Sequence, residues 1–184
     1  MNVTKPPRPT VAQRLDAGQI DGQQALELTR EAALRTLDRA AKSQADLAVS
    51  LLRRGYPEHL VDSVLDRLTS VGILDDAAYA MAIVRSRQAE RGLAKSALAR
   101  ELARRGIPNE LAETALGQVT GATEDETMQA LIVKSLNRTS ELEYAKRVRR
   151  TIGVLGRKGY EPEKVYPAVF AALAAEEARE PNSG

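Results

Sequence analysis

The chain contains no cysteine and no tryptophan, and it has one histidine and one phenylalanine among 184 residues. The absence of cysteine excludes disulfides, thiolate metal ligands and cysteine nucleophiles, and it fits a reducing compartment. The single histidine, His59, excludes a metal site built on clustered imidazoles. Because aromatic residues make up only 3% of the chain, the core must consist of Leu, Val, Ile and Ala. We therefore expect close-packed helices rich in alanine.

The chain also lacks a long apolar run, an apolar export signal and a recognisable catalytic motif. No stretch approaches the roughly 18 apolar residues of a membrane-spanning helix, and Lys5 and Arg8 lie among prolines without an apolar segment. We therefore expect a cytoplasmic protein without membrane attachment. No glycine-rich phosphate loop is present, and the adjacent Asp75 and Asp76 stand where a helix cap is needed. The sequence predicts a protein that is not an enzyme and that holds neither cofactor nor metal.

A motif of two cations, glycine and a nearby proline occurs three times. Its glycines are Gly55, Gly106 and Gly159, which stand 106 − 55 = 51 and 159 − 106 = 53 residues apart. After each proline, apolar residues recur at helical spacing. A regular period of about 50 residues is long enough for a three-helix unit and is typical of helical repeat proteins. We predict an all-α fold, a tandem array of three three-helix repeats that forms an elongated, curved helical protein.

We divide the chain into three repeats and two flanking segments. The repeats are expected at 21–72, which includes an N-terminal helical extension, at 73–120 and at 121–178. Residues 1–20 are expected to form a flexible, proline-rich arm, because proline removes backbone donors and fixes φ. Residues 179–184 are expected to form a frayed tail.

Cap residues predict where individual helices begin. Ser43 is expected to cap the second helix of the first repeat, Asp75 or Asp76 the first helix of the second repeat, and Ser140 the second helix of the third. Pro167 falls some five residues into the last helix, beyond the first turn that tolerates proline. We therefore expect a kink or a later helix start at this residue.

Cations are unevenly distributed, although the formal net charge is only +2. The helix dipole favours cations at helix C-termini, but it does not account for Arg85, Arg87 or the basic run 146–150, which we place in helix interiors. Such clusters indicate a polyanion or an acidic protein surface as the partner. The predicted partner-binding residues are Arg85, Arg87, Arg91, Lys95, Arg100, Arg104, Arg105, Lys146, Arg147, Arg149, Arg150, Arg157 and Lys158.

Three-helix units also occur in helix-turn-helix proteins, whose last helix enters the DNA major groove. Here the third helix of the first repeat carries Glu58, Asp62 and Asp66 outside its apolar face, and phosphates repel carboxylates. A sequence-specific DNA reader is therefore disfavoured. A general nucleic-acid-binding module and a helical scaffold for an acidic partner both stay open.

A second motif lies in the middle of the chain. It consists of a Leu-Asp-Asp turn, an aromatic-alanine pair, an arginine, a glycine, a Glu-Leu pair and a basic residue followed by Gly-Ile. These residues are Leu74, Asp75, Asp76, Tyr79, Ala80, Arg85, Gly92, Glu101, Leu102, Arg105, Gly106 and Ile107. The motif resembles the RecX family of bacterial recombination regulators, and the resemblance covers about residues 30–175.

The resemblance implies a regulatory protein that binds RecA and RecA filaments on single-stranded DNA. It implies modulation, most often inhibition, of the recombinase, ATPase and co-protease activities of RecA, in the control of recombination, DNA repair and the SOS response. We expect a monomer, with weak direct DNA binding as an additional property. Leu74 and Tyr79 are expected to pack between repeats. The alternative is a nucleic-acid-binding helical repeat protein without sequence preference.

Overall fold

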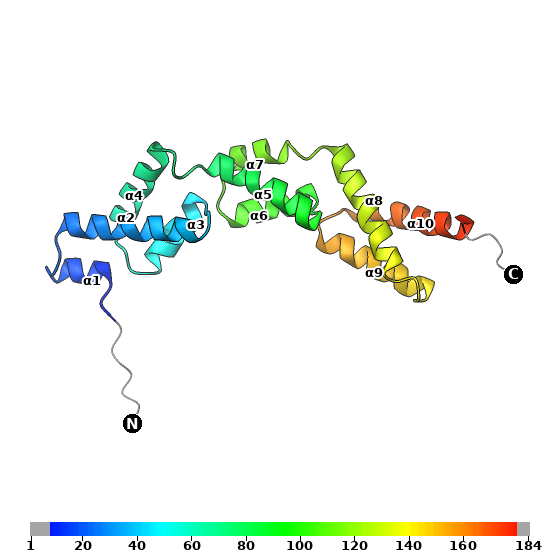
Figure 1. Ribbon diagram of the computed structural model, residues 1–184, viewed down its shortest axis with the longest axis horizontal. Helices are drawn as coiled ribbons and strands as arrows, with labels where there is room; N and C mark the ends of the chain where they lie inside the picture. Colours follow the sequence, from blue (N-terminus) through cyan, green and yellow to red (C-terminus); the bar gives the residue numbers. More distant parts are fainter. Residues whose placement is uncertain (1–7, 180–184) are drawn as a thin grey trace, which may run out of the picture. The chain divides into compact units, whose positions relative to one another are not determined.

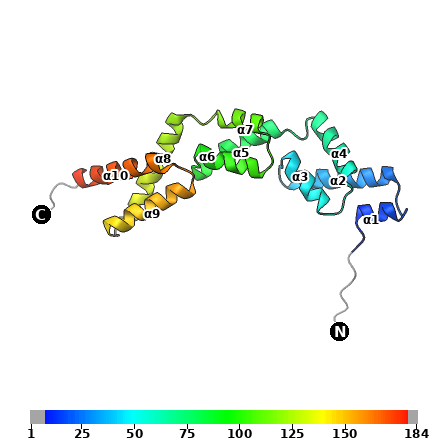
Figure 2. The same cartoon turned by 180° about the vertical axis from the view of Figure 1, so that it is seen from behind.

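The computed structural model describes residues 8–179, and every regular element in this part of the chain is a helix (Figure 1 and, from behind, Figure 2). The helices are α1 (Val11–Asp16), α2 (Gly22–Arg39), α3 (Gln44–Leu52), α4 (Glu58–Ser70), α5 (Asp76–Arg91), α6 (Lys95–Arg104), α7 (Asn109–Leu116), α8 (Gly121–Asn137), α9 (Tyr144–Arg157) and α10 (Pro162–Arg179). The predicted all-α class is confirmed. Residues 1–7 of the expected arm and 180–184 of the expected tail lie outside the described residues.

The described residues form two compact units. The first contains 8–79 and 105–107, and the second contains 80–104 and 108–179. The division therefore runs through α5 and assigns the turn between α6 and α7 to the first unit. It does not follow the repeat boundaries expected at 72 and 120, so those boundaries stay a prediction.

The first unit has its main core where α2, α3 and α4 pack together. The buried residues of this core are Ala32, Ala33, Leu47, Leu51, Val61, Val64, Leu65, Leu68 and Leu74. Ser43 caps α3 as predicted, since its hydroxyl oxygen accepts a hydrogen bond from the Asp46 amide at 3.1 Å. The same hydroxyl donates to the Arg105 carbonyl at 2.5 Å. Ser43 thus starts α3 and holds the turn 105–107 against it.

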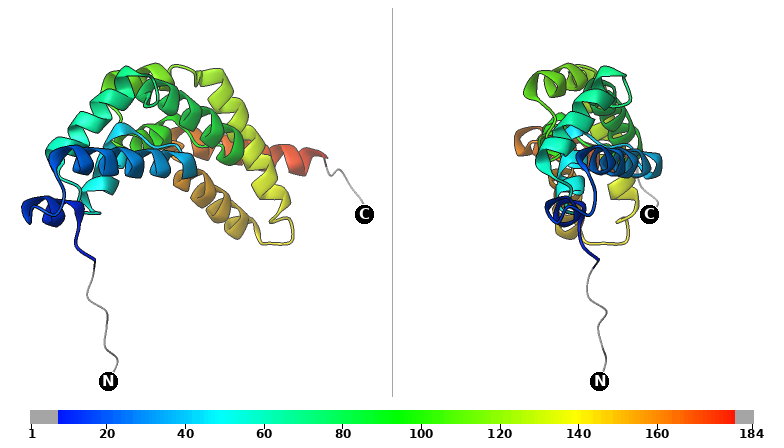
Figure 3. Two further views of the ribbon diagram at one scale, coloured as in Figure 1. Left: turned by 60° about the vertical axis from the view of Figure 1, so that its left-hand side comes forward. Right: turned by 90° about the vertical axis from the view of Figure 1, so that its left-hand side faces the viewer.

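Helix α1 lies in the segment that we expected to be a flexible arm. Thr10 caps it in a reciprocal pair with Gln13, and the Ala12 amide donates to the Gly55 carbonyl at 3.0 Å. Its apolar residues Val11 and Leu15 pack beside a small core, and α1 lies next to α2 (Figure 3). Residues 11–16 are therefore helical and docked, because the capping pair and these apolar contacts outweigh the effect of the prolines before them.

The second unit has its main core between α8, α9 and α10. The buried residues of this core are Ala94, Met128, Ile132, Leu136, Leu155, Tyr160, Val165, Val169 and Leu173. The cap predicted at Ser140 is wrong, because α9 begins at Tyr144 with Glu143 at its N-cap. The buried Thr139 extends the end of α8 by donating to the Ser135 carbonyl at 2.9 Å. The chain therefore needs the turn 140–143 before the next helix can start.

Helix α10 contains Pro167 in its interior and begins at Pro162. The later start that we considered is therefore wrong. Pro162 occupies the first helical position, where its missing N–H costs nothing. Pro167 removes one bond in the second turn, but it lies on the exposed side of the helix. Water can satisfy a carbonyl on that side, which explains why the helix continues.

Two turn glycines make equivalent contacts with earlier helices. A Cβ on Gly106 would lie 2.5 Å from the Ala45 Cβ, and a Cβ on Gly159 would lie 2.7 Å from the Ala97 Cβ. Both glycines have positive φ, +67° and +90°. In the second unit, the Ser96 hydroxyl donates to the Gly159 carbonyl at 2.6 Å, as Ser43 does to Arg105 in the first. The repeated glycine motif thus corresponds to a repeated contact on the first turn of a helix.

Replacing Ser43 by alanine should lower the free energy of unfolding by about 1 to 3 kcal/mol. The change removes an N-cap worth roughly 0.5 to 2 kcal/mol and leaves the Arg105 carbonyl without this buried donor. Urea denaturation provides the measurement. Ser50→Ala in the same helix, whose side chain caps nothing, is the matched control. Equal destabilisation by the two variants would contradict the role assigned to Ser43.

Candidate anion-binding groove

The predicted partner-binding cations fall into two groups in the structure. Most have exposed side chains, namely Arg85, Arg91, Lys95, Arg100, Arg104, Lys146, Arg149, Arg150 and Arg157. Arg87, Arg105, Arg147 and Lys158 are partly covered and contact other parts of their own unit. The exposed group can meet a partner directly, whereas the second group also supports the fold.

Arg87 and Arg105 hold neighbouring elements together. The Arg87 Nε lies 3.1 Å from the Glu101 Oε1, a pair that joins α5 to α6 with Glu101 almost fully buried. The Arg105 Nη1 donates to the Tyr79 hydroxyl at 2.6 Å and lies 3.7 Å from the Asp46 Oδ2. Tyr79 therefore packs against the turn 105–107 within the first unit. Both arginines form contacts within the chain, so any contact with a binding partner would be made in addition to these contacts.

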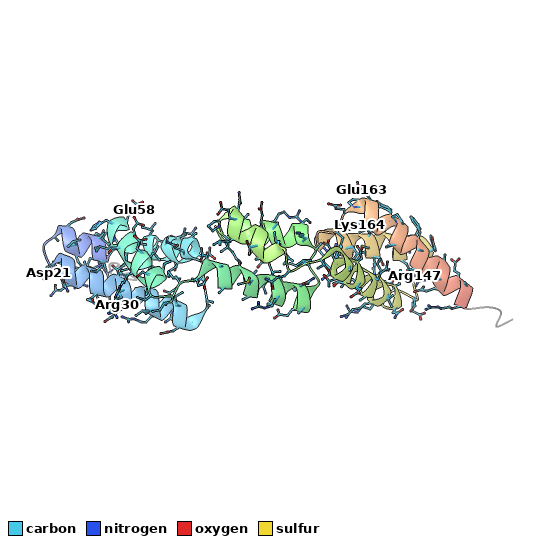
Figure 4. All side chains as sticks on the ribbon, turned by 90° about the horizontal axis from the view of Figure 1, so that it is seen from above. Asp21, Arg30, Glu58, Arg147, Glu163 and Lys164 are labelled. Carbon is cyan, nitrogen blue, oxygen red and sulfur yellow. The ribbon has the colours of Figure 1, made fainter. Side chains whose placement is uncertain are left out.

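Arg147 is the most strongly held of the predicted cations. Its side chain is only 16% exposed, and its Nη2 lies 2.6 Å from the Glu176 Oε2 on α10. The same nitrogen donates to the Leu136 carbonyl at 3.4 Å. Arg147, labelled in Figure 4, thus connects α9 to both α8 and α10. This arginine is better explained by the packing of three helices than by contact with a partner.

Arg147→Glu should lower the free energy of unfolding by about 3 to 5 kcal/mol, since it places a carboxylate beside the partly buried Glu176. Arg150→Glu, three residues further along the same helix but exposed, should change it by no more than about 0.5 kcal/mol. Thermal or urea unfolding of the two variants compares them directly. If Arg147→Glu unfolds at the same midpoint as Arg150→Glu, the structural role of Arg147 is wrong.

A groove of about 640 Å³ lies between α8 and α9. Its lining residues are Leu131, Lys134, Ser135, Arg138, Thr139, Arg149, Arg150, Gly153, Val154, Arg157 and Lys158. Six of these residues are cationic and none is acidic. We call this feature the α8–α9 groove.

Helical spacing on both walls explains the cluster. Lys134 on α8 and Arg138, the C-cap residue that follows this helix, stand four residues apart and therefore share one face. On α9, Arg150 and Arg157 are seven residues apart and also share a face. The two helices are joined at their contact by the hydroxyls of Ser135 and Thr151, 2.8 Å apart. The packing of α8 on α9 thus brings two basic faces together along one groove.

Sequence reasoning selected Arg149, Arg150, Arg157 and Lys158 but left Lys134 and Arg138 out of the predicted set. The signal for the missing pair was their i,i+4 spacing on the helix before the basic run. Sequence alone does not show that this face of α8 lies beside α9.

The groove cations are not neutralised by nearby acids. Lys134, Arg138, Arg149, Arg150 and Arg157 have no ion pair within residues 8–179. Lys158 donates to the Arg91 carbonyl, and burial, followed by the charges of Arg91 and Lys134, lowers the pKa of its ammonium group. The repulsion between Lys134 and Lys158 arises within the groove itself. A bound anion would reduce this repulsion and would be attracted by the positive charge of the groove.

The helix dipole accounts for Arg157, in the last turn of α9, but not for the basic run at the start of this helix. Because α9 begins at Tyr144, the run 146–150 lies in its first two turns and not in its interior as expected. Cations are disfavoured near a helix N-terminus. Ion pairing compensates Lys146 through Glu143 at 3.0 Å, but Arg149 and Arg150 have no such partner among the described residues. The presence of these two arginines near the start of α9 is therefore better explained by binding of an external anion than by a role in the fold.

The repeat spacing shows which residues of the second repeat correspond to the groove arginines Arg149 and Arg150. By the 53-residue offset, Arg149 and Arg150 correspond to Ser96 and Ala97 (149 − 53 = 96; 150 − 53 = 97). On α6, those small residues contact the turn at Gly159. On α9, the equivalent positions carry large cations that line an open groove. The third repeat thus has a basic surface where the second repeat is covered by its own chain.

The groove contains binding groups but no catalytic set. Its side chains are cations, hydroxyls and two aliphatic residues, so it can hold phosphates or carboxylates but offers no general base. The described part of the chain also has no helix that combines the length and apolar character needed to cross a bilayer.

Comparison with known proteins identifies relatives along most of the chain. Residues 30–68 match the first three-helix domain of RecX, and residues 75–116 match the second. A regulatory protein RecX from Thermobifida fusca (strain YX) is 41% identical over 147 residues, which cover 80% of each chain. One from Mycobacterium avium (strain 104) is 38% identical over 154 residues, covering 83% of this chain and 89% of the relative.

Two crystal structures share the fold. RecX from Lactobacillus salivarius aligns with a TM-score of 0.70 at 20% identity, covering 83% of this chain and 99% of that one. A second regulatory protein RecX aligns with a TM-score of 0.71 at 21% identity, covering 93% and 82%. At these identities the structures support the architecture alone. The identities near 40% to RecX sequences over four fifths of the chain show more: this chain belongs to the RecX family of regulatory proteins.

Proposed function

We propose that this chain inhibits RecA filaments on single-stranded DNA and that it contacts them through the α8–α9 groove. The RecX family fixes the broad function, since its members are regulatory proteins that modulate RecA. Beyond this broad function, we propose that the effect on RecA is inhibition and that the α8–α9 groove is the contact site. We also propose that the chain acts as a monomer in the bacterial cytoplasm.

The observation that carries the proposal is the uncompensated charge of the groove. Arg149, Arg150 and Arg157 face Lys134 and Arg138 without an acidic residue in the lining. A RecA filament on DNA offers two kinds of anion, which are phosphates and acidic side chains. A groove of this charge can bind either, and binding across a filament surface would hinder the changes that accompany ATP hydrolysis and strand exchange.

Arg85, Arg100 and Arg104 extend the proposed contact to a second region. They are exposed on α5 and α6 and can add electrostatic attraction, which speeds association more than it strengthens the complex. Arg87, Arg105 and Arg147 contribute indirectly by holding helices in place.

A second candidate function is direct binding of nucleic acid without sequence preference. The groove favours it because six cations can follow a phosphate backbone. The described lining contains no aromatic side chain on which bases could stack. Direct DNA binding by the chain alone should therefore be weak and should fall steeply as salt is raised.

The proposal is tested by adding the chain to a RecA strand-exchange reaction on single-stranded DNA. Product formation should fall at or below one copy of the chain per RecA protomer. Unchanged strand exchange at equimolar dose would contradict inhibition. Loss of exchange that is reversed by excess naked single-stranded DNA would favour the second candidate, in which the chain acts by occupying DNA.

A further inference from the structure

The α9 wall of the α8–α9 groove has an open space at Gly153. This residue is the only one of the lining residues that has no side chain. Arg149 and Arg157 stand four residues before and after it on α9, so the three residues share one face of the helix. At the rise of an α-helix, the Cα atoms of the two arginines are about 12 Å apart. This face thus presents two arginines with a gap between them.

The glycine is unfavourable for the helix in which it lies. Gly153 is in the interior of α9 and has a helical backbone, so it does not need the positive φ that favours glycine. Glycine in such a position lowers the equilibrium constant for helix formation about four- to fivefold relative to alanine. Every other glycine of residues 8–179 lies at a helix start, in the last turn of a helix or beyond its end. Gly153 is thus the one described glycine in the middle of a helix.

Packing of the helices does not account for glycine at this position. A Cβ on Gly153 would lie 3.4 Å from the Arg157 Nη1, and no atom of α8 or α10 would lie within 4 Å of it. A guanidinium group ends a long, flexible side chain and can move slightly at little cost. At Gly159, by contrast, the Ala97 Cβ would be only 2.7 Å away. The fold therefore requires glycine at 159 but would accept a side chain at 153.

We propose that Gly153 determines how tightly the groove binds, because it lets an oxyanion of the RecA filament lie close to the α9 backbone between Arg149 and Arg157. The attraction between opposite charges grows as their distance falls, and hydrogen bonds between ionised groups are among the strongest. A side chain at 153 would hold the oxyanion away from both guanidinium groups. The proposal rests on the function proposed above, since it concerns the same groove and the same partner.

Replacing Gly153 by leucine tests the proposal, since leucine is uncharged and favours a helix. Binding to RecA filaments preformed on single-stranded DNA, measured by co-sedimentation, should weaken at least about tenfold, as expected when a charged hydrogen bond is lost. The melting temperature, measured by circular dichroism, should rise by about 1 to 4 °C, because the helix propensity improves. A purely structural role for the glycine would lower both quantities. Gly153→Ala fills less of the space, so it should weaken binding less and should also melt at no lower temperature.

The matched control is Gly156→Leu, three residues further along the same helix. Gly156 is exposed and does not line the groove, and a Cβ there would meet no atom within 4 Å. This variant should bind filaments as tightly as the native chain does. Equal loss of binding in the Gly153 and Gly156 variants would overturn the proposal, and so would native binding by Gly153→Leu.

The role of Arg157 is separated by a double variant. In an Arg157→Ala background, Gly153→Leu should weaken filament binding again, because leucine takes space from the oxyanion itself. No further loss would overturn the proposal, since the glycine would then act only by leaving room for Arg157. Binding to single-stranded DNA alone at low salt identifies the oxyanion. An equal loss there supports the proposal with a DNA phosphate, and a loss confined to filaments supports it with an acidic side chain of RecA.

The Arg149→Glu, Arg150→Glu variant tests the proposed function itself in the same assay. Native binding by that variant would contradict the function proposed for the groove, and the role of Gly153 with it. Weak binding by that variant together with native binding by Gly153→Leu would contradict the role of Gly153 alone.

Discussion

Replacing Arg149 and Arg150 together by glutamate is expected to weaken binding to RecA filaments on single-stranded DNA by about 100-fold or more. Both side chains line the α8–α9 groove without an acidic neighbour. A contact between a charged group and its partner is worth about 1.5 to 3 kcal/mol, and each 1.4 kcal/mol is a factor of ten. Co-sedimentation with preformed filaments measures the affinity. The fold should be unaffected because both residues are exposed.

The matched control for this pair is Arg39→Glu with Arg67→Glu. These arginines are exposed in the first unit and lie outside the groove, and the double variant changes the net charge by the same amount. It should lose only the general electrostatic attraction, which salt screens. If the control weakens filament binding as much as the groove variant does at about 150 mM salt, total charge and not the groove determines binding.

Gly159→Ala should destabilise the protein by roughly 2 to 5 kcal/mol, the largest effect that we expect from a single methyl group. A residue with a Cβ costs about 1 to 2 kcal/mol in the left-handed region, and Gly159 has φ +90°. The new Cβ would also lie 2.7 Å from the Ala97 Cβ and 2.9 Å from the Ala97 amide nitrogen. Such overpacking adds about 1 to 3 kcal/mol. Urea denaturation gives the free energy of unfolding.

Gly72→Ala separates the two causes. Gly72 has a similar φ of +74°, but a Cβ there would meet no atom within 4 Å. This variant should therefore show only the backbone cost of about 1 to 2 kcal/mol. Equal losses at Gly72 and Gly159 would mean that the close approach of the turn to α6 contributes nothing.

Local signals in the sequence predicted the helices well. Ser43 marks the start of α3 because a cap bonds to an amide only three residues away. Gly55, Gly72 and Gly106 end helices through a positive φ that side chains resist. Such features depend mainly on neighbouring residues, although the cap predicted at Ser140 from the same kind of signal is wrong.

Features that depend on distant residues were predicted less well. Helix α1 was missed because its capping pair, Thr10 and Gln13, was overlooked beside the prolines, and because the helix also depends on contacts with Gly55 and the core around Ile20. Arg147 was assigned to partner binding because its main partner, Glu176, lies 29 residues away on another helix. Basic residues in a helix appear identical in a sequence whether they face a carboxylate or solvent.

The candidate site shows the same limit. The sequence identified the cations of α9 but not the α8 wall, because Lys134 and Arg138 join them only when the two helices pack. It also placed the run 146–150 in a helix interior, whereas the buried Thr139 and the turn after it delay the start of α9. The assignment of the groove to RecA binding stays a proposal that the charge pattern supports.

The most direct test is the rate of ATP hydrolysis by RecA filaments preformed on single-stranded DNA, titrated with the native chain and with the Arg149→Glu, Arg150→Glu variant. The account predicts inhibition by the native chain at or below one copy per RecA protomer, and a need for at least about ten times more of the variant, given the affinity lost with two charged contacts. Equal inhibition by the two proteins would show that the groove does not carry the regulatory contact.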